Sequence, residues 1–194
     1  MAESEKDTRE FIMSVANNLF ARYGFSKTTM NDIAEAAGKA KSSLYHYFQG
    51  KEQVFQAILD KEYNLLKKEI GHAISLEDTP HLKLKSFFIT RMKVLKNIAN
   101  FYAAIKDEYL EHYSFIEKLR ENHNREEMEV IKSILESGIR DNSFSIKDID
   151  ACTAALFLMM KGTENFIILE PDQNKNEKIL ESITETVFFG IIKR

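Results

Sequence analysis

Residues 26–51, SKTTMNDIAEAAGKAKSSLYHYFQGK, predict two short helices joined by a tight turn. The apolar residues Met30, Ile33 and Ala37 recur at intervals of three and four, which is the spacing of one face of a helix. Ala34 lies on the same face and is small enough for a second helix to cross it closely. The pattern therefore predicts a first helix of about two turns.

Polar residues mark the two ends of this first helix. Thr29 is a good N-cap residue, and Asp32 follows three positions later, which is the spacing of a capping box with Asp in the usual Glu or Gln position. Gly38 follows the last apolar residue, where a glycine adopts positive φ without steric cost. The first helix is therefore predicted to end at Gly38.

The second helix carries one apolar pair and an otherwise polar surface. Leu44 and Phe48 are four residues apart and would anchor it. The other side chains would offer donors to phosphates and base edges; they are Lys41, Ser42, Ser43, Tyr45, His46 and Tyr47. This combination predicts a helix-turn-helix that binds DNA, although many short amphipathic helix pairs share the pattern.

The stretch from Phe25 to Phe55 resembles the DNA-binding domain of the tetracycline-repressor (TetR) family of bacterial regulators. The helix expected over residues 7–23 fits the family too, whereas the rest of the chain resembles it only in length and helical character. The matching residues cover about a quarter of the chain at fixed spacing and are Gly24-Phe25, Thr28-Thr29, Asp32-Ile33-Ala34, Ala37-Gly38, Leu44-Tyr45, Tyr47-Phe48, Lys51-Glu52 and Val54-Phe55.

The resemblance implies roles for individual side chains. Thr29 and Lys51 would contact phosphate, each from the start of a helix. The second helix would supply groove-facing and phosphate-donating side chains, namely Lys41, Ser42, Ser43, Tyr45, His46 and Tyr47. Replacing Lys51 should then weaken binding to all DNA sequences and lower the salt dependence by about one unit of slope.

Two residues depart from the family pattern. Lys39 stands where a buried Val is usual, and it is either an added phosphate contact or a solvated lysine in a loosened turn. Ala40 stands where a capping Ser is usual and cannot cap. The second helix is therefore expected to begin one or two residues later, with Ser42 as its N-cap.

Composition predicts an all-α protein of about nine helices. Hydrophobic residues make up 44% of the 194, Phe occurs 14 times, and no run of alternating β-branched residues suggests a sheet. We expect a three-helix helix-turn-helix domain over residues 1–50 and a helical ligand-binding and dimerisation domain over 51–194. The net charge is −3, but residues 22–51 hold five basic and two acidic side chains, or +3, which favours a specific DNA reader.

Periodicity and capping signals predict the helices of the second domain. Thr79-Pro80 marks one helix start, and Ser114 with Glu117 and Ser145 with Asp148 have capping-box spacing. Gly71 and Gly138 are expected at helix ends. The predicted helices cover residues 51–70, 79–98, 99–112, 114–138, 145–169 and 175–193.

The helices expected over 145–169 and 175–193 are apolar on more than one side. Because one chain can bury only part of that surface, they are predicted to pair with their copies in a homodimer. Two-fold symmetry would suit a pseudo-palindromic operator of double-stranded DNA. The predicted interface residues are Leu156, Met159, Phe166, Ile183, Val187, Phe188 and Ile191.

Aromatic and Met side chains in the second domain could line an apolar pocket, although plain core packing explains them as well. The resemblance implies an inducer pocket here, and its apolar character favours a lipophilic small molecule. Arg91 and Lys161 are expected to be solvated surface charges, with binding of a polar or anionic ligand end as the alternative. The candidate lining residues are Phe88, Met92, Phe101, Tyr102, Tyr109, Met128 and Met160.

Enzymatic and metal-binding motifs are missing from the sequence. The five His residues have no ligand spacing, and neither a phosphate-binding glycine loop nor a nucleophile elbow occurs. We therefore expect no catalysis, no metal and no cofactor. The lone Cys152 excludes an intrachain disulfide and is expected in the core, while the charged first ten residues and short apolar runs predict a cytoplasmic protein without a membrane segment.

The resulting hypothesis is a cytoplasmic, homodimeric repressor that a small lipophilic ligand releases from its operator. One alternative is a DNA-binding protein of the same fold that responds to a protein partner. Another is a helical binding protein whose helix-turn-helix motif is idle.

Overall fold

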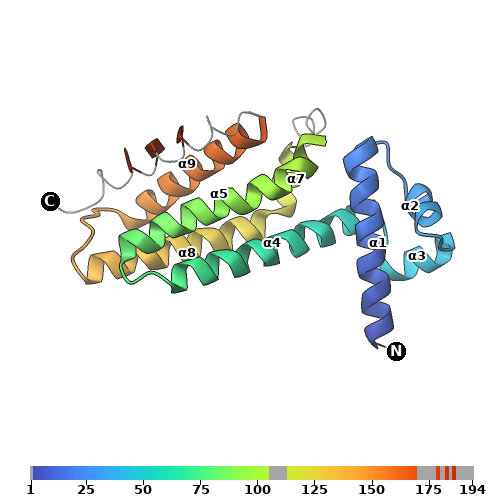
Figure 1. Ribbon diagram of the computed structural model, residues 1–194, viewed down its shortest axis with the longest axis horizontal. Helices are drawn as coiled ribbons and strands as arrows, with labels where there is room; N and C mark the ends of the chain where they lie inside the picture. Colours follow the sequence, from blue (N-terminus) through green and yellow to red (C-terminus); the bar gives the residue numbers. More distant parts are fainter. Residues whose placement is uncertain (1, 105–112, 170–177, 180–181, 184, 187–194) are drawn as a thin grey trace. The chain divides into compact units, whose positions relative to one another are not determined.

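The structure, a computed structural model, is all-helical over the residues that it describes, and these ranges contain no strand. They are residues 2–104 and 113–169, with 178–179, 182–183 and 185–186. The all-α prediction is confirmed. The helices follow one another along two compact units: residues 1–64 with 100–119, and residues 65–99 with 120–194 (Figure 1).

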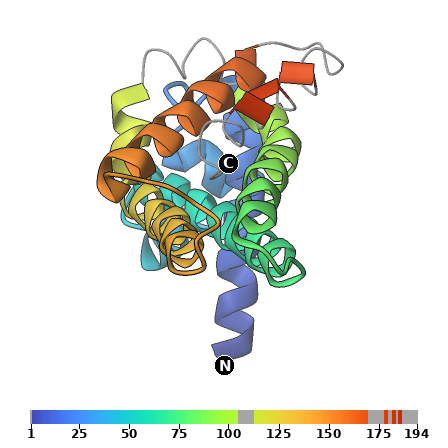
Figure 2. The same cartoon turned by 90° about the vertical axis from the view of Figure 1, so that its left-hand side faces the viewer.

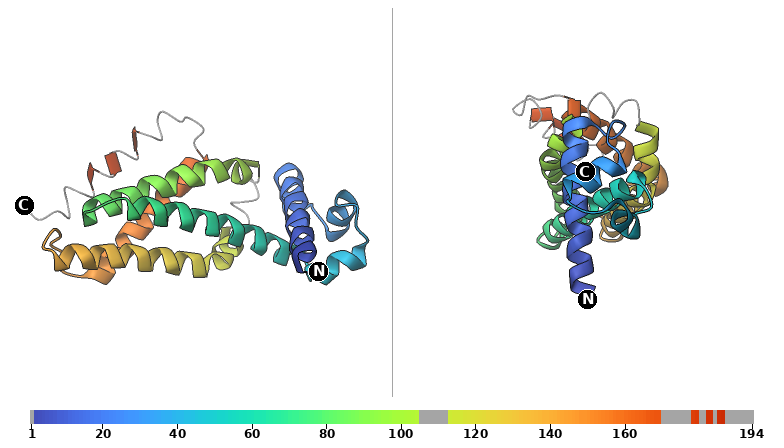
Figure 3. Two further views of the ribbon diagram at one scale, coloured as in Figure 1. Left: turned by 60° about the horizontal axis from the view of Figure 1, so that its bottom comes forward. Right: turned by 90° about the vertical axis from the view of Figure 1, so that its right-hand side faces the viewer.

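The first unit is built on three N-terminal helices, α1 (Ala2–Tyr23), α2 (Met30–Ala36) and α3 (Lys41–Tyr47). It also contains the first part of α4 (Lys51–Ser75) and the short α7 (Tyr113–Leu119). Figure 3 shows α2 and α3 beside α1. Their shared core consists of side chains that are nearly inaccessible to solvent: Ile12, Ala16, Phe20, Ile33, Leu44, Phe48, Val54 and Phe55.

Aromatic rings hold the centre of this unit. The ring of Phe25 lies 5.4 Å from that of Phe20, 5.1 Å from that of Phe55 and 5.6 Å from that of Phe115. Tilted rings at such distances contribute about 0.5–1.5 kcal/mol per pair beyond their buried area. The α1–α2 turn, which contains Phe25, is therefore fixed to α4 and α7.

The predicted ends of α2 are confirmed. The Thr29 hydroxyl accepts from the Asp32 amide at 3.2 Å, and the Asp32 carboxylate accepts from the Thr29 amide at 2.8 Å. Gly38 has φ +59°, a conformation that favours glycine. The chain can therefore reverse tightly between α2 and α3.

The prediction that α3 begins late was wrong. The helix begins at Lys41, and Ala40 occupies the N-cap position with extended backbone and no side-chain hydrogen bond. Leu44, which is fully buried, and Phe48, which is 1% exposed, anchor the helix through packing. Burial of these two side chains thus sets the start of α3 without a polar cap.

The second unit is a helical bundle that contains the end of α4, most of α5 (Pro80–Ala104), α8 (Glu121–Arg140) and α9 (Ile149–Leu169). Figure 2 views these helices nearly end on. Helices α8 and α9 form an antiparallel pair that is joined by residues 141–148. The buried side chains at the centre include Leu84, Phe87, Met92, Ile131, Leu135, Leu156 and Met160.

The single helix predicted over residues 114–138 was also wrong. The chain forms α7 and α8 instead, with Arg120 at the N-cap of α8 and no side-chain cap there. The Arg120 side chain is turned inwards and donates to Glu164 at 2.5 Å. The break therefore coincides with a buried ion pair to a residue 44 positions away, which local periodicity does not reveal.

Other predicted helix ends move by several residues. Helix α9 begins at Ile149, because Asp148, and not Ser145, accepts from the amide of Ala151 at 3.0 Å. Gly71 lies inside α4 and Gly138 inside α8, so neither ends a helix. Gly138 is needed for another reason, since a Cβ there would lie 2.2 Å from the Phe144 ring.

Two predicted helices fall wholly or partly outside the described residues. Residues 99–104 of the helix predicted over 99–112 form the last turns of α5, and residues 105–112 lie outside. Most of the helix predicted over 175–193 also lies outside.

Candidate nucleic-acid interface

Helix α3 separates its anchoring side chains from its polar ones. Leu44 is fully buried, whereas Tyr45 is 44% exposed. Lys41, Ser42 and His46 are exposed, and Ser43 and Tyr47 are half-buried. The rings of His46 and Tyr47 meet edge to face with centres 5.3 Å apart. The helix therefore presents a polar, hydrogen-bonding face to the outside.

A surface depression of about 350 Å³ brings together predicted site residues from three helices. It joins the N-terminus of α2 to one side of α3 and to the start of α4. Four of its lining residues belong to the predicted set, and Asn31 is an exposed amide that the sequence analysis missed. The lining consists of Thr28, Thr29, Met30, Asn31, Lys41, Tyr45, Gly50, Lys51 and Glu52.

The capping box fixes the position of a negative charge at the start of α2. The Thr29 hydroxyl donates to the Asp32 carboxylate at 2.7 Å, and the Thr29 amide donates to the same oxygen. These hydrogen bonds lower the pKa of Asp32. Asp32 is therefore ionised at neutral pH, and its charge is directed at the amide end of α2.

Lys51 is held by the α1–α2 turn. Its Nζ donates to three carbonyl oxygens, those of Phe25 at 2.8 Å, Ser26 at 3.1 Å and Thr28 at 3.2 Å. It also lies 4.5 Å from the centre of the Phe25 ring. An ammonium group has three N–H donors, so these carbonyls use its full capacity. This geometry gives Lys51 a structural role, and its predicted phosphate contact stays a prediction.

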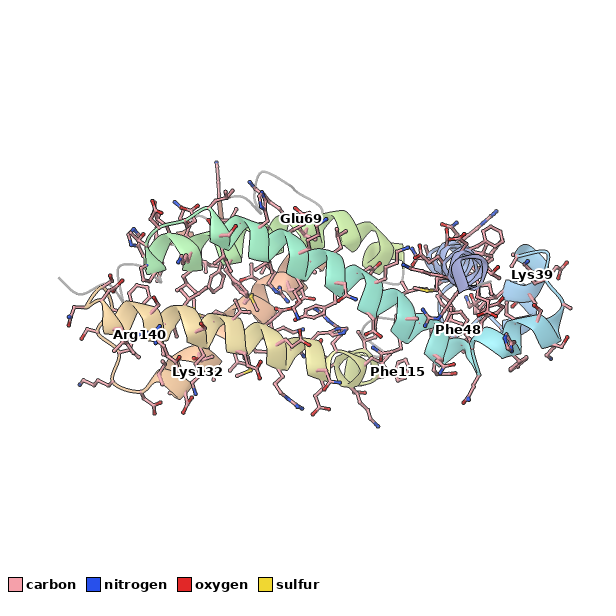
Figure 4. The ribbon with its side chains drawn as sticks, turned by 90° about the horizontal axis from the view of Figure 1, so that it is seen from below. Lys39, Phe48, Glu69, Phe115, Lys132 and Arg140 are labelled. Carbon is pink, nitrogen blue, oxygen red and sulfur yellow. The ribbon has the colours of Figure 1, made fainter. Side chains whose placement is uncertain are left out.

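Lys39 lies apart from the other predicted residues. It is exposed, and its side chain lines a different depression with Phe11 and Asp7 of α1. Figure 4 shows it on the turn between α2 and α3, whereas Phe48 lies at the opposite end of α3. The Arg9 guanidinium, which the sequence analysis did not single out, lies 4.8 Å from the centre of the Phe48 ring.

Four of the seven candidate ligand residues lie in the described part of the second unit, and three of these are buried. Phe88, Met92 and Met160 are buried, and Met128 is half-buried. The side chains of Phe101, Tyr102 and Tyr109 lie outside the described part of the chain. The described residues therefore fit both core packing and the lining of a pocket.

Arg91 and Lys161 are buried, so the prediction that they are surface charges was wrong. The Arg91 side chain is fully buried and donates to Glu127 at 2.6 Å and to Glu164 at 2.8 Å. The Lys161 ammonium lies 3.5 Å from the Glu164 carboxylate. These partners come from α8 and α9, so the local sequence around Arg91 carried no signal for them.

The predicted dimer residues differ in exposure. Leu156 is 4% exposed and packs in the core of its own chain, whereas Met159 is 39% exposed. Leu158, which the sequence analysis missed, is 68% exposed. Ile183 is half-buried, while Val187, Phe188 and Ile191 and the side chain of Phe166 lie outside the described residues.

Three further features of the described residues concern metal binding, membrane insertion and the lone thiol. Among them, no three His, Cys, Asp or Glu side chains come together as metal ligands. No described helix combines the length and apolar character needed to cross a membrane. Cys152 is half-buried, not enclosed in the core as predicted, and its burial raises the pKa of the thiol.

Comparison with known proteins agrees with this geometry. The model of the family described as bacterial regulatory proteins, tetR family, matches residues 12–58, which contain α2 and α3. The HTH-type transcriptional repressor KstR2 of Mycolicibacterium smegmatis is 28% identical over 141 residues, covering 70% of this chain and 67% of the relative. KstR2 of Rhodococcus jostii is 29% identical over 159 residues, covering 77% and 74%.

The fold recurs in solved structures. The ketosteroid transcriptional regulator KstR2 of Mycobacterium tuberculosis superposes with a TM-score of 0.63 at 22% identity, covering 96% of this chain and 95% of that one. At this identity the likeness concerns the fold. The family match agrees with what the residues of α2 and α3 indicate: residues 12–58 form a DNA-binding helix-turn-helix segment of the kind shared by the tetR family of bacterial regulatory proteins.

Proposed function

We propose that this chain is a repressor that occupies a pseudo-palindromic operator as a homodimer and leaves it when a small lipophilic molecule binds. The observation that carries the DNA-binding part is the depression in which Thr29 of α2 meets Lys41 and Tyr45 of α3. A phosphate at this position would accept from the Lys41 ammonium and the Tyr45 phenol. The exposed side chains of α3 would then lie in the adjacent major groove.

Exposed apolar side chains on α9 support the proposed dimer. Leu158 and Met159 are exposed apolar neighbours on this helix, and burial of such a patch is a usual basis of association. A two-fold dimer would set two α3 helices about one DNA turn apart. A protein that binds operator DNA in this way acts in the bacterial cytoplasm.

Release by a ligand is supported by the core of the second unit and by the relatives. One relative is named a ketosteroid regulator, which agrees with an apolar effector. Helix α4 has residues in both units, so a change in its position would affect both units. A ligand shifts this equilibrium only if it binds one arrangement more tightly than the other.

A DNA-binding assay on matched variants tests the proposal. Lys41→Ala removes the predicted phosphate donor, and Lys147→Ala removes one positive charge from an exposed residue between α8 and α9. Lys41→Ala should weaken binding to all DNA sequences and reduce the salt slope by about one. Lys147→Ala should bind like the unaltered protein. Equal affinities for the two variants would contradict the proposed interface.

A further inference from the structure

A second depression lies beside the one that holds Lys41 and Tyr45. It has a volume of about 360 Å³, and Thr28 lines both depressions. The two therefore adjoin, and the second extends the surface of the first unit from α3 towards the end of α1. The residues that line the second depression are Leu19, Tyr23, Lys27, Thr28 and Asp32.

Two exposed cations lie at this second depression. The Lys27 side chain lines it, and the Arg22 guanidinium lies 5.1 Å from the centre of the Tyr23 ring, which lines it too. In the part of the chain that the structure describes, neither cation has a hydrogen-bond or ion-pair partner. Tyr23 is 50% exposed. An ammonium, a guanidinium and a phenol are therefore all available to an external acceptor.

The turn that carries Lys27 is held on both sides of this residue. The carbonyls of Ser26 and Thr28 accept from the Lys51 ammonium at 3.1 Å and 3.2 Å. The Thr28 hydroxyl donates to the Gly24 carbonyl at 2.7 Å, and Gly24 has φ +85°, so the chain leaves α1 in a tight turn. Binding of an acceptor by Lys27 would therefore not have to order the turn first.

One carboxylate, that of Asp32, lines the same depression. It accepts from the Thr29 amide at 2.8 Å and from the Thr29 hydroxyl at 2.7 Å, so it is bonded to the start of α2. Lys27 and Arg22 supply two positive charges against this negative one, which leaves +1. Glu35, about one turn further along α2, does not line the depression. The net positive charge favours an anion as the ligand.

A DNA strand supplies anions at a spacing that suits two adjoining depressions. Successive phosphates of one strand lie about 3.4 Å apart along the duplex axis. A strand that places one phosphate against Lys41 and Tyr45 would therefore bring a following phosphate to Lys27. The guanidinium of Arg22 and the phenol of Tyr23 would then lie beside the sugar–phosphate backbone, which accepts hydrogen bonds from such groups.

We propose that the end of α1 and the α1–α2 turn form a second phosphate-binding surface. Lys27, Arg22 and Tyr23 contact the DNA backbone next to the phosphate that Lys41 and Tyr45 bind. Backbone contacts carry no sequence information, so they fix the position of α3 in the groove and do not select bases. This inference rests on the proposed operator binding, and it extends the contact with DNA beyond α2 and α3.

Salt titration of DNA binding measures the contact. The probe is a duplex that carries the inverted repeat enriched from random DNA by the full-length protein. Lys27→Ala should lower the affinity roughly tenfold at about 0.1 M salt and reduce the salt slope by about one, because one fewer counterion is released. Lys61→Ala is the matched control, since it removes the same charge from an exposed lysine of the first unit that pairs with Glu10 at 3.3 Å. Its slope should equal that of the unaltered protein.

Arg22→Gln and Tyr23→Phe test the other two donors. Arg22→Gln should reduce the salt slope by about one, as Lys27→Ala does. Tyr23→Phe removes only a hydroxyl, so it should weaken binding at an unchanged slope, because the phenol carries no charge. Full affinity of both variants would contradict a surface that includes the end of α1.

Neutral methylphosphonates at single positions of the duplex locate the contact. At the phosphate that Lys27 binds, the replacement should weaken binding by the unaltered protein and leave Lys27→Ala unaffected, because the partner of that phosphate is already gone. Lys41→Ala should lose its sensitivity at a different, neighbouring phosphate. Coupling of both lysines to the same phosphate would mean a single site and would overturn the second surface.

The outcomes separate failure of this inference from failure of the proposed function. An unchanged slope for Lys27→Ala, or the absence of any phosphate coupled to Lys27, would overturn the inference and leave the operator proposal standing. If the full-length protein enriches no repeat, the proposed function fails and the inference falls with it. Because Lys27 is exposed, its variant should unfold at the same temperature as the unaltered protein, which distinguishes a lost contact from a lost fold.

Discussion

The Lys51 ammonium lies against the Phe25 ring and donates to the Phe25 carbonyl, so the first residue of α4 is bonded to the turn that precedes α2. The family resemblance suggested a phosphate contact for this lysine. The geometry indicates that it first organises the DNA-binding unit and fixes the segment that leads to Thr29.

Lys51→Met should therefore destabilise the protein. The variant keeps the apolar stem but loses three hydrogen bonds from a charged group, and we expect a loss of roughly 1–3 kcal/mol in the free energy of unfolding. Chemical denaturation measures this. The salt slope of DNA binding should change little, so a slope lowered by one together with unchanged stability would support a phosphate contact instead.

Gly138→Ala should destabilise the second unit, because the new Cβ would overlap the Phe144 ring. Overpacking of this kind costs about 1–3 kcal/mol. Gly71→Ala is the control, since a Cβ there meets no atom within 4 Å and α4 continues through it. That change should stabilise by up to about 1 kcal/mol. Thermal unfolding measures the stability of both variants. A Gly138→Ala variant more stable than Gly71→Ala would contradict the close packing of Gly138 against Phe144.

Leu158→Glu should weaken the proposed dimer. The side chain is 68% exposed on α9, and a carboxylate there would have to be buried against the partner. Leu76→Glu places the same charge at a residue that is 69% exposed beyond the end of α4. Sedimentation velocity should detect monomers for the first variant and dimers for the second. Dimers for both would place the interface elsewhere.

Acid should weaken the buried ion pairs that Glu164 forms with Arg91 and Arg120. Burial alone would raise its pKa, but the charges of Arg120, Arg91 and Lys161 outweigh burial and hold the pKa well below 4.5. Because the folded-state pKa is depressed, the stabilisation is present above pH 4.5 and is lost as the pH falls through the folded-state pKa. The stability difference between the unaltered protein and Glu164→Gln should thus shrink below pH 4.5. A constant difference would argue against an ionised Glu164.

Local patterns sufficed for the helix-turn-helix and failed for the buried charges. The two residues of the α2 capping box are three positions apart, and the turn after α2 depends only on the positive φ of Gly38. Both features are local, so the sequence predicted them. The partners of Arg91 are 36 and 73 residues away. An arginine on a helix is usually solvated, so only the tertiary structure could show that this one is buried.

Separation along the chain also explains which features of the DNA-binding site the sequence predicted and which it missed. The spacing of Leu44 and Phe48 predicted which face of α3 is buried, and the polar residues between them are largely exposed as expected. The carbonyls bonded to Lys51 lie 23 to 26 residues before it, beyond the reach of periodicity. Asn31 was missed because an exposed amide near a helix start has no signal of its own.

The proposed function depends on sequence-specific reading of DNA by a two-fold dimer. Selection of bound sequences from random duplex DNA, with the full-length protein, tests it most directly. An inverted repeat with half-site centres about one helical turn apart should be enriched, and Lys41→Ala should bind the same repeat more weakly. Recovery of no enriched sequence at low salt, or of a single unrepeated half-site, would contradict it.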